Sequence, residues 1–525
     1  MASKKLLDLA EELVSPAITK KPKAKVRPKA KSKPKAVYAN PSTKVGEGTN
    51  IDLSTVTLPE MSRVPGADPN FGPTGRISTR VPKRGKETLP ETYSGALTIG
   101  QEQMEQGGTL GKNMEFTSQF PGFGALKGLP PEDAAKIYNA IQRKNIEFTL
   151  DRLPPEFQDR SKMWYVGANR IAEELSNKYG IPRSSASGAL AALSPQMDWF
   201  KNASLGERVI DTLIAKRDVP WSAEMDAIPK KYPAFTSPTK NAGVPNYETW
   251  ASIRGKKLSE LETPIQKAMW IRAYDEAHNP KTYRAITPEG ELGDIMLSAS
   301  GKPMDIGWGG FGEISKAVQA AESGGDFNKI SDAMGSQHKV RNFFNNIEVP
   351  FSDQGDITVD THQIAVGAFR PLAGSDDLTN QGLGGMFKNA PTGSMGNYGQ
   401  QADNVRAVAA DRGLLPREAQ SISWEGIRGL FDVKTPKTKQ MVDDIWRAYD
   451  RGDLSQDQAL AMIEERMGGF KMPTWFSEPS PKRSIGRGNS TMYGLGGLLG
   501  MGLLDQALDD QDKDAQMSGL LGRGI

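Results

Sequence analysis

The sequence predicts a mostly α-helical protein whose two ends are irregular. Apolar residues recur at helical spacing through the middle of the chain, and few segments alternate in the way strands do. Glycine and proline, 55 and 35 of the 525 residues, gather towards the ends, which is typical of loops and disordered tails. The middle of the chain still holds enough Trp, Leu, Ile and Phe for one sizeable core.

The N-terminal part is expected to lack a compact fold. Within residues 1–36, the stretch 3–14 has the spacing of a short amphipathic helix, and a basic stretch rich in Lys, Pro and Ala follows it. Proline removes backbone donors and like charges repel, so this basic tail should stay extended and disordered. Residues 37–128 are rich in Gly, Pro, Ser and Thr and are expected to be a largely irregular linker.

A helical domain is predicted over residues 129–432. Its first helix opens with Pro131-Glu132-Asp133, a second is ended by Gly180, and a third is stopped by Pro195. Further helices are expected at 199–216, 263–278, 311–323, 326–334, 338–347, 361–369 and 401–412. Two stretches inside the domain, 217–262 and 279–310, are interpreted as loop insertions. A helical hairpin at 433–470 and a Gly-rich acidic tail at 471–525 complete the chain.

The charge of the chain is strongly asymmetric. The net charge is +3, but without nine basic residues in the tail it would be −6. Nine positive charges without an acid favour contact with nucleic acid, so DNA is the expected partner of the tail. The nine residues are Lys20, Lys21, Lys23, Lys25, Arg27, Lys29, Lys31, Lys33 and Lys35.

Composition also excludes several kinds of site. The chain has no cysteine, which excludes disulfides, zinc–thiolate sites and iron–sulfur clusters. No apolar run of 18 residues is free of glycine breaks, so no membrane span is expected. No cofactor is predicted.

Three short motifs follow one another along the domain. The first is Leu193-Ser194-Pro195-Gln196, the second is Met334-Gly335-Ser336-Gln337-His338-Lys339, and the third is Val359-Asp360-Thr361-His362. Together they resemble the LS-x-Q turn, the glycine hairpin and the V-D-T-H element of helix–hairpin–helix DNA glycosylases of the endonuclease III type. The resemblance implies a helix–hairpin–helix glycosylase-like fold for the helical domain.

The resemblance also implies roles for individual residues. Asp360 would be the catalytic carboxylate, because cleavage of an N-glycosidic bond builds positive charge on the sugar. Lys339 would be the amine nucleophile that forms a Schiff base at abasic sites, for which it must be partly neutral. Gln196, beside Ser194, would fill the gap left by a flipped base. Gly335 and His338 would contact the DNA backbone at the hairpin.

The motifs depart from that family at three places. Gln337 stands where the family has its second glycine, which weakens the expectation of close backbone approach to a phosphate. Val340 stands where the family has threonine, and Ala365 where it has arginine. These departures leave two functions open: DNA cleavage as a glycosylase or abasic-site lyase, and DNA binding without chemistry.

Plainer interpretations exist for the same residues. Asp360 is well placed to cap the following helix, a role that is compatible with catalysis. A metal site at His338 and His362 is less favoured than a supporting role, and Trp308 is more readily a core anchor than a stacking platform. Segments 266–284, 306–318 and 414–431 resemble uncharacterised proteins of tailed bacteriophages in style. The alternative function is therefore a non-enzymatic virion protein that binds viral DNA, located in the virion or the host cytoplasm and in contact with other virion proteins through its tails.

Overall fold

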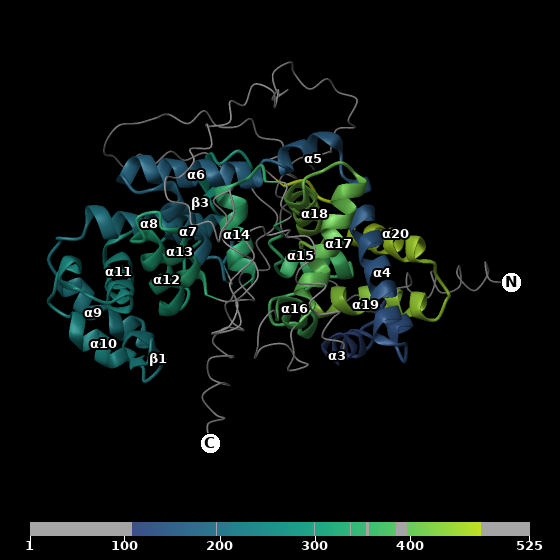
Figure 1. Ribbon diagram of the computed structural model, residues 1–525, viewed down its shortest axis with the longest axis horizontal. Helices are drawn as coiled ribbons and strands as arrows, with labels where there is room; N and C mark the ends of the chain where they lie inside the picture. The colour runs from purple at the N-terminus through teal and green to yellow at the C-terminus, as the bar shows by residue number, and fades with distance from the viewer. Residues whose placement is uncertain are drawn as a thin grey trace, which may run out of the picture. The chain divides into compact units, whose positions relative to one another are not determined.

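A computed structural model describes residues 108–195, 197–298, 300–335, 338–352, 356–384 and 396–473. The chain divides into two compact units, residues 1–62 and 63–525, and all described residues belong to the second. The basic tail, Gln196 and the Gly-rich tail after 473 lie outside the described residues. Where it is described, the protein is mostly α-helical, as the sequence predicts (Figure 1).

The helices surround two separate hydrophobic cores. The core of the inserted lobe draws its residues from one continuous stretch, Ala168 to Ile347. The core of the split lobe combines residues from Leu110 to Trp164 with residues from Ile357 to Ile463. The inserted lobe therefore interrupts the split lobe in the sequence, and the expected single domain at 129–432 has two cores.

The inserted lobe is built around one helix of small residues. Helix α7 (Arg183–Ala192) is buried along its length from Ser184 and contacts α6 (Trp164–Tyr179), α8 (Trp199–Ala215), α12 (Phe311–Ala321), α13 (Phe327–Met334) and α14 (His338–Glu348). Serine, alanine and glycine let these helices approach closely: a methyl group added at Gly188 would lie 2.9 Å from Ala320 Cβ. Helix α11 (Pro264–His278) packs on α12 and on α9 (Ala223–Lys231).

The stretch 217–262 differs from the expected loop. It contains α9, α10 (Asn246–Ile253), two 3₁₀ turns (Pro233–Thr236 and Leu258–Glu260) and the antiparallel pair β1 (Lys240–Asn241) and β2 (Val244–Pro245). Met225, Phe235 and Ile253 are fully buried in the core of the inserted lobe. Proline misleads here because Pro245 directly precedes α10 and Pro233 opens a 3₁₀ turn, positions where its missing N–H costs nothing.

The stretch 279–310 is a hairpin followed by an irregular segment. Strands β3 (Arg284–Ile286) and β4 (Leu292–Ile295) pair antiparallel, and their connecting turn docks on α6. A methyl group added at Gly167 of α6 would lie 2.2 Å from the carbonyl oxygen of Pro288. Arg160 donates two hydrogen bonds, of 2.9 and 3.0 Å, to the carboxylate of Glu289 in the same turn. The turn is therefore fixed to the domain rather than free.

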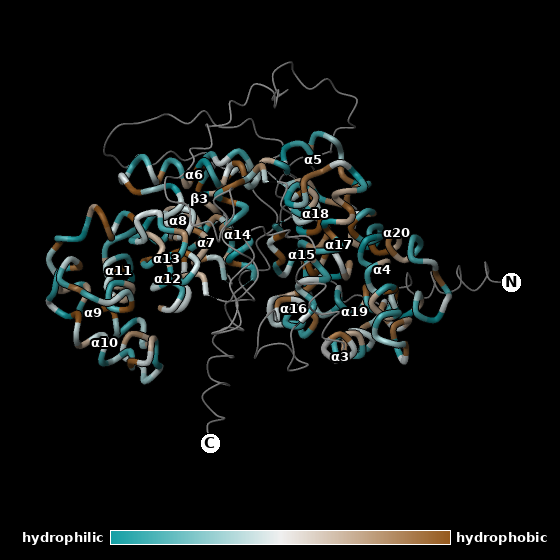
Figure 2. Tube along the Cα trace, in the orientation of Figure 1, coloured by the Kyte–Doolittle hydropathy of each residue, from teal (hydrophilic) through white to brown (hydrophobic). Residues whose placement is uncertain are grey.

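The split lobe is organised by the long helix α4 (Pro131–Arg152). This helix contacts α3 (Gly108–Thr117) from before the inserted lobe, and α15 (Thr361–Ala368), α17 (Tyr398–Asp411), α18 (Pro416–Leu430) and α20 (Gln456–Met467) from after it. Helix α19 (Pro436–Asp450) pairs with α20, α16 (Asp377–Leu383) contacts α15, and α5 (Pro155–Ser161) contacts α18. Figure 2 shows apolar and polar stretches alternating along these helices.

Helix α3 lies within the range expected to be irregular. Its buried residues Leu110 and Met114 belong to the core of the split lobe. The segment GTLGKNMEFT contains two glycines and little apolar periodicity, so its helix depends on packing against α4 rather than on local pattern.

Candidate functional site

Lys339 lies in the first turn of α14, the helix that follows α13 in the chain. Its Nζ atom donates a hydrogen bond of 2.8 Å to the carbonyl oxygen of Ser194, at the turn after α7. Burial lowers the pKa of the Lys339 amine, and the charge of Asp360 offsets part of that effect. The amine is therefore more easily made neutral than an ordinary lysine amine.

The segment that delivers Asp360 is extended but belongs to no sheet. Ile357, Thr358 and Val359 are buried, and side chains satisfy their backbone groups. Tyr398 of α17 accepts the N–H of Val359 and donates its hydroxyl to the carbonyl oxygen of Ile357, at 3.1 and 2.8 Å. Gln420 of α18 accepts the N–H of Thr358 and donates to the carbonyl oxygen of the same residue, at 3.1 and 2.9 Å.

Helix α14 holds the opposite side of this segment. Asn342 accepts the N–H of Ile357 at 3.1 Å, and Asn346 donates to the hydroxyl of Thr358 at 3.1 Å. The side chains of one lobe thus fix the backbone that leads to Asp360 in the other. The β-rich sequence 357–359 predicts extended backbone correctly, but polar side chains take the place of a neighbouring strand.

Asp360 has two partners, one for each carboxylate oxygen. Its Oδ1 atom accepts the N–H of Gln363 at 2.9 Å, which caps α15 as the sequence predicts. Its Oδ2 atom accepts the indole N–H of Trp424, from α18, at 2.9 Å. The carboxylate is held rigidly in one orientation by these two bonds.

The three motifs therefore meet where the two lobes touch. Ser194 and Lys339 come from the inserted lobe and Asp360 from the split lobe. Within the described residues, Lys339 and Asp360 form no direct ion pair. They interact through the electrostatic attraction that offsets part of the effect of burial on the pKa of Lys339. The Ser194 hydroxyl is buried and has no hydrogen-bond partner among the described residues.

His362 packs against the ring of Trp424. The two rings are edge to face, with centroids 5.9 Å apart. Burial, followed by the positive charges of Lys434, Arg428 and Lys339, lowers the pKa of His362 well below 6.5. The neutral imidazole is therefore favoured, and the three cations that act on it come from α14, α18 and the segment after α18.

Trp424 and Arg428 are parts of this site that sequence reasoning missed. The Arg428 guanidinium lies over the Trp424 ring, 4.4 Å from its centroid, so the ring is held between a cation and the Asp360 carboxylate. Trp424 also meets the ring of Trp164 edge to face at 6.0 Å. No local motif marks Trp424, because its link to Asp360 spans 64 residues.

The structure makes the hairpin residues less available than expected. His338 is 5% exposed, and its ring packs against Tyr398 with centroids 5.4 Å apart, so it does not present a surface to DNA. The N–H of Gly335 donates within α13, and its carbonyl oxygen accepts from Arg341 at 2.9 Å. Gly335 has a positive φ of 60°, and among the described residues beyond its chain neighbours no atom lies within 4 Å of the place a Cβ would take.

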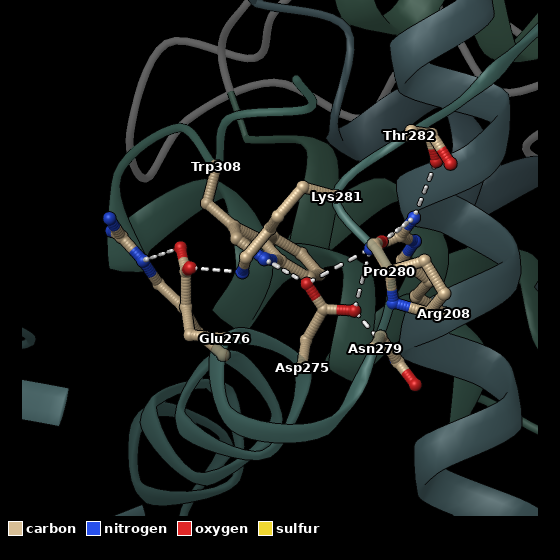
Figure 3. Close-up of polar contacts among 9 residues, drawn as sticks. Arg208, Asp275, Glu276, Asn279, Pro280, Lys281, Thr282 and Trp308 are labelled. Carbon is tan, nitrogen blue, oxygen red and sulfur yellow. Dashed lines mark hydrogen bonds and ion pairs between the residues drawn. The ribbon is translucent and has the colours of Figure 1, made fainter. Parts of the chain in front are cut away.

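A second buried polar cluster lies in the inserted lobe and is structural (Figure 3). Asp275 of α11 is fully buried and accepts hydrogen bonds from Arg208, Asn279 and Trp308, at 2.9, 2.7 and 2.8 Å. Arg208 also donates to the carbonyl oxygens of Pro280 and Thr282. The cluster ties both ends of the 279–310 stretch to α8 and α11. Trp308 packs against the core of the inserted lobe, in line with its interpretation as an anchor.

No metal site and no membrane-spanning helix are found in the part of the chain that the structure describes. No group of three or more His, Asp or Glu side chains there is placed to hold a metal ion. None of the described helices has both the length and the apolar character needed to cross a membrane.

Comparison with known proteins gives one match. Residues 134–231 are similar to a family of unknown function, DUF7178. The matched stretch runs from α4 to α9 and includes Ser194, but it ends before Lys339 and Asp360. No curated protein and no solved structure matches the chain.

Proposed function

We propose that this protein binds DNA and that Asp360 and Lys339 cleave N-glycosidic bonds or abasic sites in it. The observation that carries the proposal is the meeting of an oriented carboxylate and a half-buried amine with a lowered pKa where the two lobes touch. Ligand sites commonly form at such junctions. The proposal rests also on the motifs, since helix–hairpin–helix glycosylases are what they resemble.

The chemistry assigns a different task to each group. The Asp360 carboxylate stabilises the positive charge that develops on the sugar when the base leaves. At an abasic site, the neutral Lys339 amine attacks the C1′ aldehyde carbon, water leaves, and a Schiff base remains. To reach a substrate, Lys339 exchanges its hydrogen bond with Ser194 for contact with the sugar.

Borohydride trapping tests the enzymatic part directly. An abasic duplex incubated with the wild type and borohydride should give a covalent protein–DNA adduct, because hydride reduces the Schiff base to a stable amine. Lys339→Gln should give none. Lys267→Gln is a matched control, since that lysine is also largely buried but pairs with Glu322. Equal trapping by both variants would refute the role of Lys339.

One observation favours the non-enzymatic alternative. Both oxygens of Asp360 and the amine of Lys339 have protein partners, so each residue has a structural role that does not need substrate. Under this alternative the protein is a bacteriophage virion protein that binds viral DNA. DNA binding with no adduct and no base release on uracil-containing, oxidised, alkylated or abasic duplexes would favour it.

The basic tail is proposed to contact DNA under either function. Deleting residues 20–35 removes nine positive charges. If most of them touch phosphates, the slope of log affinity against log salt should shrink by several units, at about 0.9 per contact. An unchanged slope would assign the tail to a different partner.

A further inference from the structure

Arg428 faces the junction of the lobes and is incompletely paired in its described contacts there. Its Nη1 atom bonds Glu425 of its own helix at 3.0 Å. Its Nη2 atom lies 3.9 Å from Oδ2 of Asp198, which is beyond hydrogen-bond distance. The side chain keeps 28% of its surface exposed. The contact between the lobes at Arg428 is therefore loose.

The position of Arg428 is nevertheless fixed. Its guanidinium rests on the Trp424 ring, and the same indole donates to Asp360. A group bound on the outer side of the guanidinium would thus lie one side chain away from the candidate catalytic carboxylate. Arginine presents a planar fork of donors that matches phosphate oxygens, and stacking on an aromatic ring restricts its motion before binding.

Asp198 occupies the place that such an anion would take. Its Oδ1 atom caps α8 by accepting the N–H of Phe200 at 2.9 Å, which leaves Oδ2 to face Arg428. The electrostatic surroundings suit an anion, because Lys434 and Lys339 join Arg428 in lowering the pKa of His362. A phosphate that offers two oxygens to the guanidinium fork would replace a single carboxylate oxygen at 3.9 Å.

We infer that Arg428 anchors a phosphate-binding site beside Asp360, in which a phosphate of the ligand displaces Asp198 from Arg428. Where that phosphate belongs to a nucleic-acid backbone, the inference rests on the proposed function. A free phosphate compound offers the same chemistry, and the experiment separates the two sources.

The nucleic-acid arm measures binding of a labelled abasic-analogue duplex by fluorescence anisotropy. Arg428→Gln should weaken binding about 10-fold or more, as expected for loss of a hydrogen bond between charged groups. It should also reduce the salt slope by about 0.9. Asp198→Asn should strengthen binding, because asparagine keeps the helix cap and removes the competing charge.

Arg447→Gln is the matched control. Arg447 pairs with Asp444 three residues earlier on α19, at 2.7 Å, just as Arg428 pairs with Glu425 on α18. This control should leave the affinity unchanged. Urea unfolding of each variant checks that the fold is intact, and Asp198→Asn keeps the inference testable if Arg428→Gln unfolds.

The second arm titrates inorganic pyrophosphate into the full-length protein by calorimetry. Pyrophosphate binding that Arg428→Gln abolishes, without any duplex binding by the wild type, would reject the proposed function and keep the Arg428 site. The inference is overturned if Arg428→Gln behaves like Arg447→Gln in both arms, or if the wild type binds neither probe.

Discussion

Replacing Asp360 by asparagine should destabilise the protein, although asparagine is as good a helix cap as aspartate. The amide has one oxygen and one NH₂ group. If its oxygen accepts the N–H of Gln363, its nitrogen faces the indole N–H of Trp424, now 2.9 Å from a second donor. A fully buried unsatisfied donor costs about 1–3 kcal/mol, and this donor is part-buried, so the free energy of unfolding should fall by up to that amount.

A double-mutant cycle isolates this effect. Trp424→Phe keeps an aromatic ring against Trp164 and His362 but removes the donor. In the Asp360→Asn background it should therefore cost about 1 kcal/mol less than in the wild type, or stabilise the protein. Urea unfolding of the four proteins, followed by circular dichroism and tryptophan fluorescence, gives the coupling energy.

A matched pair supplies the control for the cycle. Trp221 donates to Asp226 at 3.1 Å on the exposed surface, where water replaces a lost partner. The cycle of Trp221→Phe and Asp226→Asn should show coupling near zero. A coupling near zero for Asp360 and Trp424 as well would refute the described hydrogen bond. If the coupling is found, Asp360→Asn should be assayed for catalysis in the Trp424→Phe background, where the loss of charge is separated from misfolding.

Three further predictions concern stability. Below pH 6.5, His362 binds a proton in the unfolded chain but stays neutral in the folded protein, because its folded pKa is lowered. The free energy of unfolding should therefore fall with decreasing pH, by up to about 1.4 kcal/mol per pH unit, until the folded imidazole also binds its proton. His362→Asn should flatten that slope in urea titrations between pH 5 and 7, and an unchanged slope would exclude a lowered pKa of this imidazole in the folded protein. Gly167→Ala should lower the free energy of unfolding by about 1–3 kcal/mol or more, because backbone atoms lie 2.2–2.8 Å from the added carbon and must move. Wild-type stability in urea unfolding would contradict the described docking of the turn. Asp275→Ala should lower the free energy of unfolding by about 3–5 kcal/mol, since it leaves the guanidinium of Arg208 and the indole of Trp308 without their acceptor. The 279–310 stretch should then be cleaved faster in limited proteolysis. Equal cleavage rates would argue that the Asp275 cluster does not hold this stretch in place.

Local sequence pattern predicts the elements whose cause is local. The helical class follows from apolar spacing, and the cap at Asp360 follows from a short acid placed before a helical stretch. The pattern fails where structure depends on distant contacts. Helix α3 has a weak pattern and is stabilised by α4. The stretch 217–262 contains helices because Pro233 and Pro245 stand where a 3₁₀ turn and α10 begin, and Pro229 is tolerated inside α9.

The candidate site shows the same division. Ser194, Lys339 and Asp360 are found through short motifs, each of which lies within a few residues of a turn. Trp424 meets Asp360 through a contact that no periodicity encodes. The buried polar side chains that fix 357–359, among them Tyr398 and Gln420, are ordinary helix residues in the sequence and gain their role only when the lobes come together.

The order in which the chain is synthesised has a consequence for the split lobe. The core of the inserted lobe is contiguous from Ala168 to Ile347 and can be completed as soon as this stretch leaves the ribosome. During that time the apolar faces of α3 and α4 stay exposed, because α15, α17 and α18 have not yet been synthesised. A chain released before residue 357 would have a folded inserted lobe and an incomplete core in the split lobe. Such a species is prone to aggregate. Newly made protein is therefore vulnerable until the helices that follow residue 357 have been made, and a chaperone that covers α4 would protect it.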